Sequence, residues 1–335
     1  MVIEIISLPE APEVEEENND YKFGCFEARH ARPTQEDALA WCVIEKEKIK
    51  HLTPQDISKR LWTTYKYLDE AVKSLPEKSG TTASTTVFDG QNSLLVATLA
   101  DAASFLVMYD PQGQVSKVSR LNSVIHKPNL PSEQRRIKEL GGFITCNGGV
   151  YRVNGVLAVS RAIGDYDIKG QATEKLISSN ATIDIVNVDS LFSQKRIAKL
   201  QVIITCDGFT DAAGYEATKS TQEAYLASTL SMLNGGQPGQ KSEKEIAKHL
   251  VKKAKLHSWD NISVGVQSLM QGQPVFLGVY DGHGGSQTAR FVAQHIIPIF
   301  LYQCLLSNTD YAAQPLSVNS NEMAYRKDNE HIIFI

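Results

Sequence analysis

Short apolar runs bounded by turn residues fill the middle of the chain and predict β-strands. The clearest are residues 82–88, 93–100, 104–110, 200–207 and 262–269, which are rich in Val, Ile, Leu, Phe and Thr. Most are separated from the next run by a short turn, so antiparallel pairing is favoured over parallel pairing.

Helical spacing of apolar residues marks a second set of segments. Residues 53–75 begin with Thr53 as the expected N-cap and Pro54 at the first helical position, and their apolar residues recur every three or four positions. Grouped strands and grouped helices favour an α+β fold, with antiparallel sheets covered by helices, over a doubly wound parallel fold. Further helices are expected at 132–140, 220–234, 243–257 and 286–303.

Chain length and net charge limit the possible domain organisation and the kinds of partner. With 335 residues, one large domain with extra termini is the first expectation and two domains the second. We expect an acidic flexible leader at 1–20, a main domain at 21–303 and a tail at 304–335. The net charge of −4 gives no reason to expect nucleic acid or a membrane surface as a partner. The basic run at 248–257 is interpreted as the solvated face of a helix.

The cysteines and the N-terminus bear on the compartment. The five cysteines are scattered and form no C-x-x-C pair, which favours a reducing environment over a disulfide framework. No basic and apolar leader of the secretory type is recognisable, and no run reaches the ~20 apolar residues of a membrane span. A cytoplasmic protein is therefore expected.

Acidic residues beside turn residues are the candidates for a functional site. Any one of these Asp-Gly or Asp-Asn pairs is ordinary turn chemistry, and Arg32 or His283 alone is an ordinary surface residue. Carboxylates gathered at the rim of a core repel one another unless a hard cation such as Mg²⁺ or Mn²⁺ lies among them. The acidic positions are Glu36-Asp37, Asp207-Gly208, Asp260-Asn261 and Asp281-Gly282.

The set of motifs resembles the metal-dependent Ser/Thr protein phosphatases of the PPM, or type 2C, family. The matching stretches cover about residues 21–303, so the match is far more specific than a lone Asp-Gly. They read "RPTQEDA" from Arg32, "SGTTAS" from Ser79, "IHKPNLPSEQRRIKELGG" from Ile125, "RVNGVLAVSRAIGDYDIKG" from Arg152, "ITCDGFTDA" ending at Ala212, "DNISV" from Asp260 and "VYDGHGG" ending at Gly285.

This resemblance implies a four-layer sandwich of two antiparallel sheets flanked by helices, with two Mg²⁺ or Mn²⁺ ions at one edge. It implies that Asp281 bridges both ions, that Arg32 binds the substrate phosphate and that His283 is the general acid. In relatives, the aspartate that corresponds to Asp101 can help to hold a third, weaker ion. The remaining implied ligands are the carbonyl of Gly282, with Asp207 and Asp260 for the first ion and Glu36 and Asp37 for the second.

The implied activity is removal of phosphate from phosphoserine and phosphothreonine in a phosphoprotein, by a monomer. Two close metal ions lower the pKa of a bridging water, and a guanidinium fork fits phosphoryl oxygens. An alkoxide leaving group needs a proton, which an imidazole can supply. A catalytically silent member that binds phosphoproteins or regulators is the alternative.

The chain departs from the family pattern in the order of its motifs. The family's "GDSR" reads Ala100-Asp101-Ala102-Ala103, and its "DHKP" has Ile125 in place of the acid. The "DGHGG" strand and the helix after it, which the family places soon after "EDA", come last here. We expect the strand ending at Asp281 to form an antiparallel hairpin with the strand that begins after Asp260, which would place both carboxylates side by side.

Overall fold

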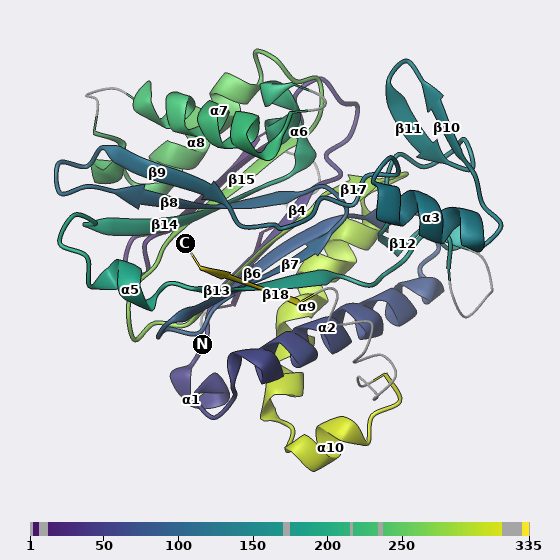
Figure 1. Cartoon of the computed structure of the whole chain (residues 1–335), viewed down its shortest axis with the longest axis horizontal. Coiled ribbons are helices and arrows are strands. Elements are labelled where there is room, and N and C mark those ends of the chain that lie inside the picture. Colours follow the sequence, from purple (N-terminus) through teal and green to yellow (C-terminus); the bar gives the residue numbers. More distant parts are fainter. Residues whose placement is uncertain are drawn as a thin grey trace.

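The chain forms two facing β-sheets with helices on their outer sides (Figure 1). The structure is a computed structural model that describes residues 3–6, 13–169, 175–214, 217–233, 237–316 and 330–334. Parts of the expected leader and tail, and residues 170–174, 215–216 and 234–236, lie outside this description, so the expected helix end at residue 234 is not described. The expected α+β sandwich of two antiparallel sheets flanked by helices is confirmed.

The seven-stranded sheet has the order β1-β4-β16-β6-β7-β13-β18. Its described pairings are antiparallel except that β13 and β18 run parallel. Its strands are β1 (Ile3–Ile6), β4 (Ala38–Val43), β6 (Ala83–Phe88), β7 (Ser93–Leu99), β13 (Thr182–Asn187), β16 (Val275–Tyr280) and β18 (Glu330–Phe334).

The six-stranded sheet has the order β2-β3-β15-β14-β8-β9, and its described pairings are all antiparallel. Its strands are β2 (Glu13–Asn18), β3 (Phe23–Ala28), β8 (Ala103–Tyr109), β9 (Val115–Arg120), β14 (Lys199–Thr205) and β15 (Ile262–Ser268). Smaller pieces are the sheet of β5 (Gly80–Thr81), β12 (Ile163–Gly164) and β17 (Gly282–His283), and the hairpin of β10 (Ile144–Asn147) and β11 (Val150–Val153).

Helices cover the outer face of each sheet, as Figure 1 shows. The long α2 begins at Pro54 after the expected cap Thr53, whose side chain forms a capping box with Asp56. The helices are α1 (Lys46–Ile49), α2 (Pro54–Ala71) and α9 (Gln287–Leu305) on the seven-stranded sheet, and α7 (Lys219–Ser231) and α8 (Glu243–Ala254) on the six-stranded sheet. Outside this layer lie α3 (Pro131–Glu139), α4 (Tyr166–Lys169), α5 (Asp189–Phe192), α6 (Asp207–Thr210) and α10 (Asn308–Ala312), with short 3₁₀ turns.

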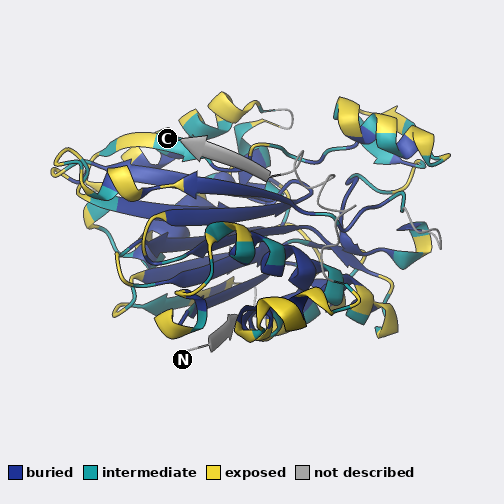
Figure 2. Cartoon of the chain, turned by 60° about the horizontal axis from the view of Figure 1, so that its bottom comes forward, coloured by how far each residue is buried: buried dark blue, intermediate teal, exposed yellow. Residues whose placement is uncertain are grey.

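Apolar side chains between the sheets hold the two layers together. Leu39 and Leu277 from one sheet pack with Ile204 from the other, and Trp41 stacks on Phe23 across the interface. The central strands of both sheets are buried in Figure 2, whereas exposed residues lie mainly on the outer helices, the loops and the edge strands β2 and β9. This rigid sandwich fixes where the loops at its ends begin.

The predicted hairpin between β15 and β16 is wrong. β15 pairs with β3 and β14, whereas β16 pairs with β4 and β6 in the other sheet. The link at 269–274 crosses between the sheets, which pack about 10 Å apart in such sandwiches. Because the chain reverses direction at this crossing, Asp260 and Asp281 still come out at the same end of the sandwich.

Part of the segment expected to be a flexible leader is ordered as the edge strand β2. Side chains alternate along a strand, so Glu13, Glu15 and Glu17 share one face. They pair with three lysines of the basic run and its neighbourhood, at N–O distances of 2.6 Å for Lys255, 2.6 Å for Lys248 and 3.3 Å for Lys244. The basic face of α8 is therefore bound by the chain's own acidic strand.

Candidate functional site

Four acidic residues converge at one end of the sandwich because of where their strands begin or end. Asp37 directly precedes β4 and Asp281 directly follows β16, so both belong to the seven-stranded sheet. Asp207 opens α6 just after β14, and Asp260 lies just before β15, so both belong to the six-stranded sheet. The structure therefore brings these four predicted residues together from both sheets.

The carboxylates lie close enough to share ions. One ligand atom each of Asp37, Cys206 and Asp281 lies within 4.8 Å of the others. Asp281 and Asp207 are hydrogen-bonded to each other through their side chains. Ser263 Oγ donates to Asp37 Oδ2 at 2.7 Å, while Asp37 Oδ1 is buried and accepts from no donor in the described residues.

Burial and mutual repulsion raise the pKa values of Asp37, Asp207 and Asp281. Burial, together with the charges of Asp207 and Asp260, raises the pKa of Asp37 to about 7. Burial and the charge of Asp207 also hold the pKa of Asp281 well above its usual range. A divalent cation among these groups would lower these pKa values and relieve the repulsion.

The chemistry of the donors fits a hard cation. Burial raises the pKa of the Cys206 thiol well above its usual range, so this group stays neutral beside the carboxylates. Ser263 N–H donates to its sulfur at 3.2 Å, which gives the thiol a structural role. The remaining donors are oxygens, the ligands that Mg²⁺ and Mn²⁺ prefer.

Glu36 and Gly282 meet at a close approach of two backbones. A Cβ added to Gly282 would lie 2.4 Å from the backbone oxygen of Glu36, so only glycine fits this position. Asn261 Oδ1 accepts from the Glu36 N–H at 3.0 Å, which ties the "EDA" segment to the residue beside Asp260. The half-buried Glu36 side chain therefore stands at the edge of the cluster.

Arg32 is anchored on the cluster by Asp260. Its Nε donates to Asp260 Oδ1 at 2.6 Å and its Nη2 to Asp260 Oδ2 at 3.1 Å, which is a bidentate pair. The hydrogen bond to Asp260 raises the pKa of Arg32. The guanidinium is about half exposed, with a side-chain accessibility of 48%, so it is open to a ligand from solvent.

His283 has a partner that the sequence reasoning did not assign. Its Nε2 lies 2.8 Å from Oδ2 of Asp165, which is buried and has a positive φ of 56°. Burial lowers the pKa of His283, but the charge and hydrogen bond of Asp165 outweigh this effect, and its pKa is raised overall. Asp165 lies in the stretch from Arg152 that resembles the family, but the resemblance gave this residue no role.

A second unassigned acid lies beside Asp101. Asp211 follows Asp207 by one helical turn, and burial together with the charge of Asp207 raises its pKa to about 8. Burial and Asp207 raise the pKa of Asp101 to about 6, and Asp101 Oδ1 is buried with no donor in the described residues. Lys127 approaches Asp211 at 3.7 Å. The spacing of four in "DGFTD" is the signal that could have identified Asp211.

The part of the chain that the structure describes contains no helix long and apolar enough to cross a membrane. This matches the absence of a long apolar run in the sequence.

Known structures share the fold. A phosphatase from a pathogenic strain of Toxoplasma gondii matches with a TM-score of 0.53 and 20% identity, over 80% of this chain and 99% of that one. A sex-determining protein of C. elegans matches with a TM-score of 0.51 and 20% identity, over 74% of this chain and 64% of that one. At this identity the likeness supports the fold alone.

Sequence relatives carry phosphatase names. The chain is 32% identical over 160 residues to "Probable protein phosphatase 2C 44" of Oryza sativa subsp. japonica, which covers 46% of this chain and 47% of that protein. It is 32% identical over 211 residues to human "Protein phosphatase 1F", over 63% of this chain and 40% of that protein. The chain thus spans less than half the length of these relatives. The family model "Protein phosphatase 2C" matches residues 37–262, and the chain belongs to this family.

Proposed function

We propose that the chain is a metal-dependent phosphatase that hydrolyses phosphoserine and phosphothreonine in proteins. The observation that carries the proposal is the convergence of four carboxyls from both sheets in one cluster: Asp37, Asp207, Asp260 and Asp281. The pKa values of Asp37, Asp207 and Asp281 are raised, and Asp260 contributes a nearby negative charge. Membership of the protein phosphatase 2C family supports the same reaction class.

Within this proposal, the residues at the sandwich end hold Mg²⁺ or Mn²⁺. Asp281, Asp207 and Asp260 would contribute carboxylates, Gly282 a backbone carbonyl, and Glu36 and Asp37 a second set of oxygens. Asp101 and Asp211 form a further acidic pair on the same side that would suit a third ion. When bound, these ions acidify water and offset the negative charge of a phosphoryl group.

Arg32 orients the substrate phosphate. Its half-exposed guanidinium lies directly on the cluster, where its planar fork can donate to two phosphoryl oxygens. Asp260 pairs with the Arg32 guanidinium in the structure, so phosphate binding replaces this carboxylate partner with phosphoryl oxygens. This exchange frees Asp260 oxygens on the side of the cluster.

His283 supplies the proton for the leaving group, and Asp165 positions it. A raised pKa keeps a larger share of the imidazole protonated near neutral pH. The hydrogen bond to Asp165 fixes one ring nitrogen, so the Nδ1 side is left to donate a proton to the serine or threonine oxygen. Asp165 itself is a positioning residue.

We also infer that β16, β17 and α9 are a transposed segment of the family fold. The family match ends at residue 262, before this segment. The inference is supported by the central place of β16 between β4 and β6, and by the packing of α9 against α2.

The experiment is hydrolysis of phosphothreonine and phosphoserine peptides with Mn²⁺, in the presence and absence of EDTA. We expect release of phosphate that EDTA abolishes. Activity that survives EDTA would reject the metal-dependent mechanism. No activity from folded protein supplied with Mn²⁺ would instead favour a silent module that binds phosphoproteins.

A further inference from the structure

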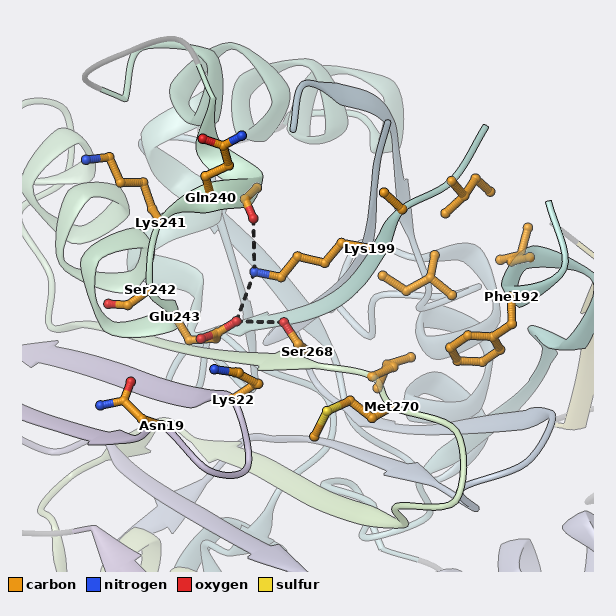
Figure 3. Close-up of a pocket in the computed structure, with 16 residues that line it drawn as sticks. Asn19, Lys22, Phe192, Lys199, Gln240, Lys241, Ser242, Glu243, Ser268 and Met270 are labelled. Carbon is orange, nitrogen blue, oxygen red and sulfur yellow. Dashed lines mark hydrogen bonds and ion pairs between the residues drawn. The ribbon is translucent and has the colours of Figure 1, made fainter. Parts of the chain in front are cut away.

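A cavity of about 520 Å³ lies at the end of the sandwich opposite to the acidic cluster (Figure 3). Its lining includes Lys199, the first residue of β14, and Ser268, the last residue of β15. The other ends of these seven-residue strands lead to Asp207 and Asp260. At ~3.3 Å per residue, the cavity and the cluster are roughly 20 Å apart. The cavity is therefore separate from the proposed catalytic site.

The polar floor of the cavity is built from buried, mutually bonded groups. Glu243 is 3% exposed, and its Oε1 accepts from Lys199 Nζ at 3.0 Å, from Ser268 Oγ at 2.6 Å and from Gln201 Nε2 at 3.0 Å. Lys199 thus neutralises the Glu243 carboxylate, whose Oε1 atom accepts from three donors. The carboxylate neither needs nor favours an added cation.

The remaining charged residues of the lining are cationic. Lys22 and Lys241 also line the cavity, which gives three lysines against one glutamate. Lys22 sits in the β2–β3 turn, and its backbone oxygen accepts from the Ser268 N–H at 3.0 Å, so the turn is fixed against the cavity. Lys22 has no ion pair within 4 Å in the described residues, and Lys241 has only a loose one, 3.9 Å from Glu245.

The opposite wall is apolar. Figure 3 shows Phe192 and Met270 on one side of Lys199, and Gln240, Lys241 and Ser242 on the other. Further apolar lining residues are Leu191, Ile197 and Leu269. The cavity therefore has a positive end and an apolar end, joined by the side chain of Lys199.

We propose that this cavity binds a small organic anion, with one acidic group and an apolar body. Its volume is within the ~300–1,000 Å³ range of sites for small molecules. An acidic group would meet Lys22 at the polar end, with Lys241 at the rim adding positive charge at longer range, while an apolar body would cover Phe192 and Met270. A cationic ligand would meet an excess of lysine, and a neutral one would leave the lysines without a counter-charge.

Isothermal titration calorimetry with three matched probes tests the proposal. The probes are 1-naphthoate, its neutral amide 1-naphthamide, and the cation 1-naphthylmethylammonium. We expect one-to-one binding of 1-naphthoate that is roughly tenfold tighter than binding of the amide, because charged hydrogen-bond partners contribute about that factor. The ammonium probe is expected to bind more weakly than the amide.

Variants locate the binding. Lys22→Gln should weaken 1-naphthoate binding about fivefold, and Lys241→Gln should weaken it less because this lysine lies at the rim. Both should leave amide binding unchanged, since each removes one exposed charge. Phe192→Ala should weaken both probes. Lys195→Gln, at an exposed lysine close in sequence but outside the lining, is the matched control and should change neither.

Three outcomes would overturn the proposal: no saturable binding of 1-naphthoate at millimolar concentration, ammonium binding as tight as carboxylate binding, or unchanged 1-naphthoate binding in the Lys22→Gln, Lys241→Gln double variant. Thermal melting of each variant shows that it is folded. Because the readout is heat of binding, the result is independent of phosphatase activity, and Asp207→Asn should bind 1-naphthoate like the unaltered protein.

Discussion

His283 Nε2 lies 2.8 Å from Asp165 Oδ2, although the two residues are 118 positions apart in the chain. The contact joins β17, which lies between β16 and α9, to the turn after β12. Gly80 lies against this carboxylate, and a Cβ there would lie 2.1 Å from Asp165 Oδ2. The backbone of β5 therefore leaves just enough room for the pair.

Asp165→Asn should lower kcat for a phosphothreonine peptide about tenfold, because His283 loses the charge that raises its pKa. The alkaline limb of the kcat profile should move to lower pH, since protonated His283 is the active form and its pKa falls. Hydrolysis of p-nitrophenyl phosphate, whose leaving group needs no proton, should change less than about threefold. Equal losses on both substrates, with an unmoved pH profile, would mean that Asp165 has only a structural role.

Arg32→Ala should have opposite effects on phosphate and on metal. KM for the phosphopeptide should rise about tenfold, because the bidentate partner of the phosphoryl group is lost. Mn²⁺ affinity, measured by calorimetry, should increase, because Asp260 no longer pairs with the guanidinium. Arg196→Ala, at an exposed arginine far along the chain, serves as the control. Weaker Mn²⁺ binding by Arg32→Ala would contradict the competition for Asp260.

The metal-free protein should lose stability as pH rises from about 4 to 8. Asp37 and Asp101 have folded-state pKa values of about 7 and about 6, above those of the unfolded chain, so the native state holds more protons across this range. Urea unfolding in EDTA should show a loss on the order of a few kcal/mol, which Mn²⁺ removes at pH 8.

Asp37→Asn provides the matched control for this pH effect. It should be more stable than the unaltered protein at pH 8 in EDTA, with a flatter pH dependence, and should gain less from Mn²⁺. A metal-free protein whose stability increases from pH 5 to pH 8 would contradict the raised pKa values.

Asp69→Ala should lower the free energy of unfolding by about 3–5 kcal/mol, because it leaves Lys169 as an unpaired buried charge. Lys169 Nζ lies 2.6 Å from Asp69 Oδ1, and the Gly164 N–H also donates to this oxygen, at 3.0 Å. Since Gly164 precedes Asp165, activity should fall as well. Glu70→Ala, which breaks the exposed pair with Lys73 on the same helix, should cost less than about 1 kcal/mol. Equal losses of unfolding free energy for Asp69→Ala and Glu70→Ala would show that the buried Asp69–Lys169 pair stabilises the fold no more than an exposed ion pair.

Local signals in the sequence were sufficient for the covering helices and for most central strands, but not for β13 or for edge strands such as β2. Thr53 and Pro54 locate the start of α2, and β7 and β8 appear as uninterrupted apolar runs because both faces of each strand are buried. Acidic residues at strand ends indicated the cluster, since a sandwich gathers strand ends at its edges.

Pairing across the sheets could not be predicted in the same way. The link at 269–274 is long enough for a hairpin and also for a crossing to the facing sheet, and sequence spacing does not separate the two. The choice depends on the partners β3, β4, β6 and β14, which come from distant parts of the chain. The Asp165–His283 pair depends on the same long-range packing, together with the positive φ of Asp165.

The most direct test of the metal-centred account is a Mn²⁺ titration of EDTA-treated, dialysed protein, with phosphate release from a phosphothreonine peptide measured at each concentration. The account predicts a rate that rises from background to saturation for the unaltered protein, and a rate at background throughout for folded Asp281→Asn. A rate independent of Mn²⁺, or the same titration curve for Asp281→Asn, would contradict it.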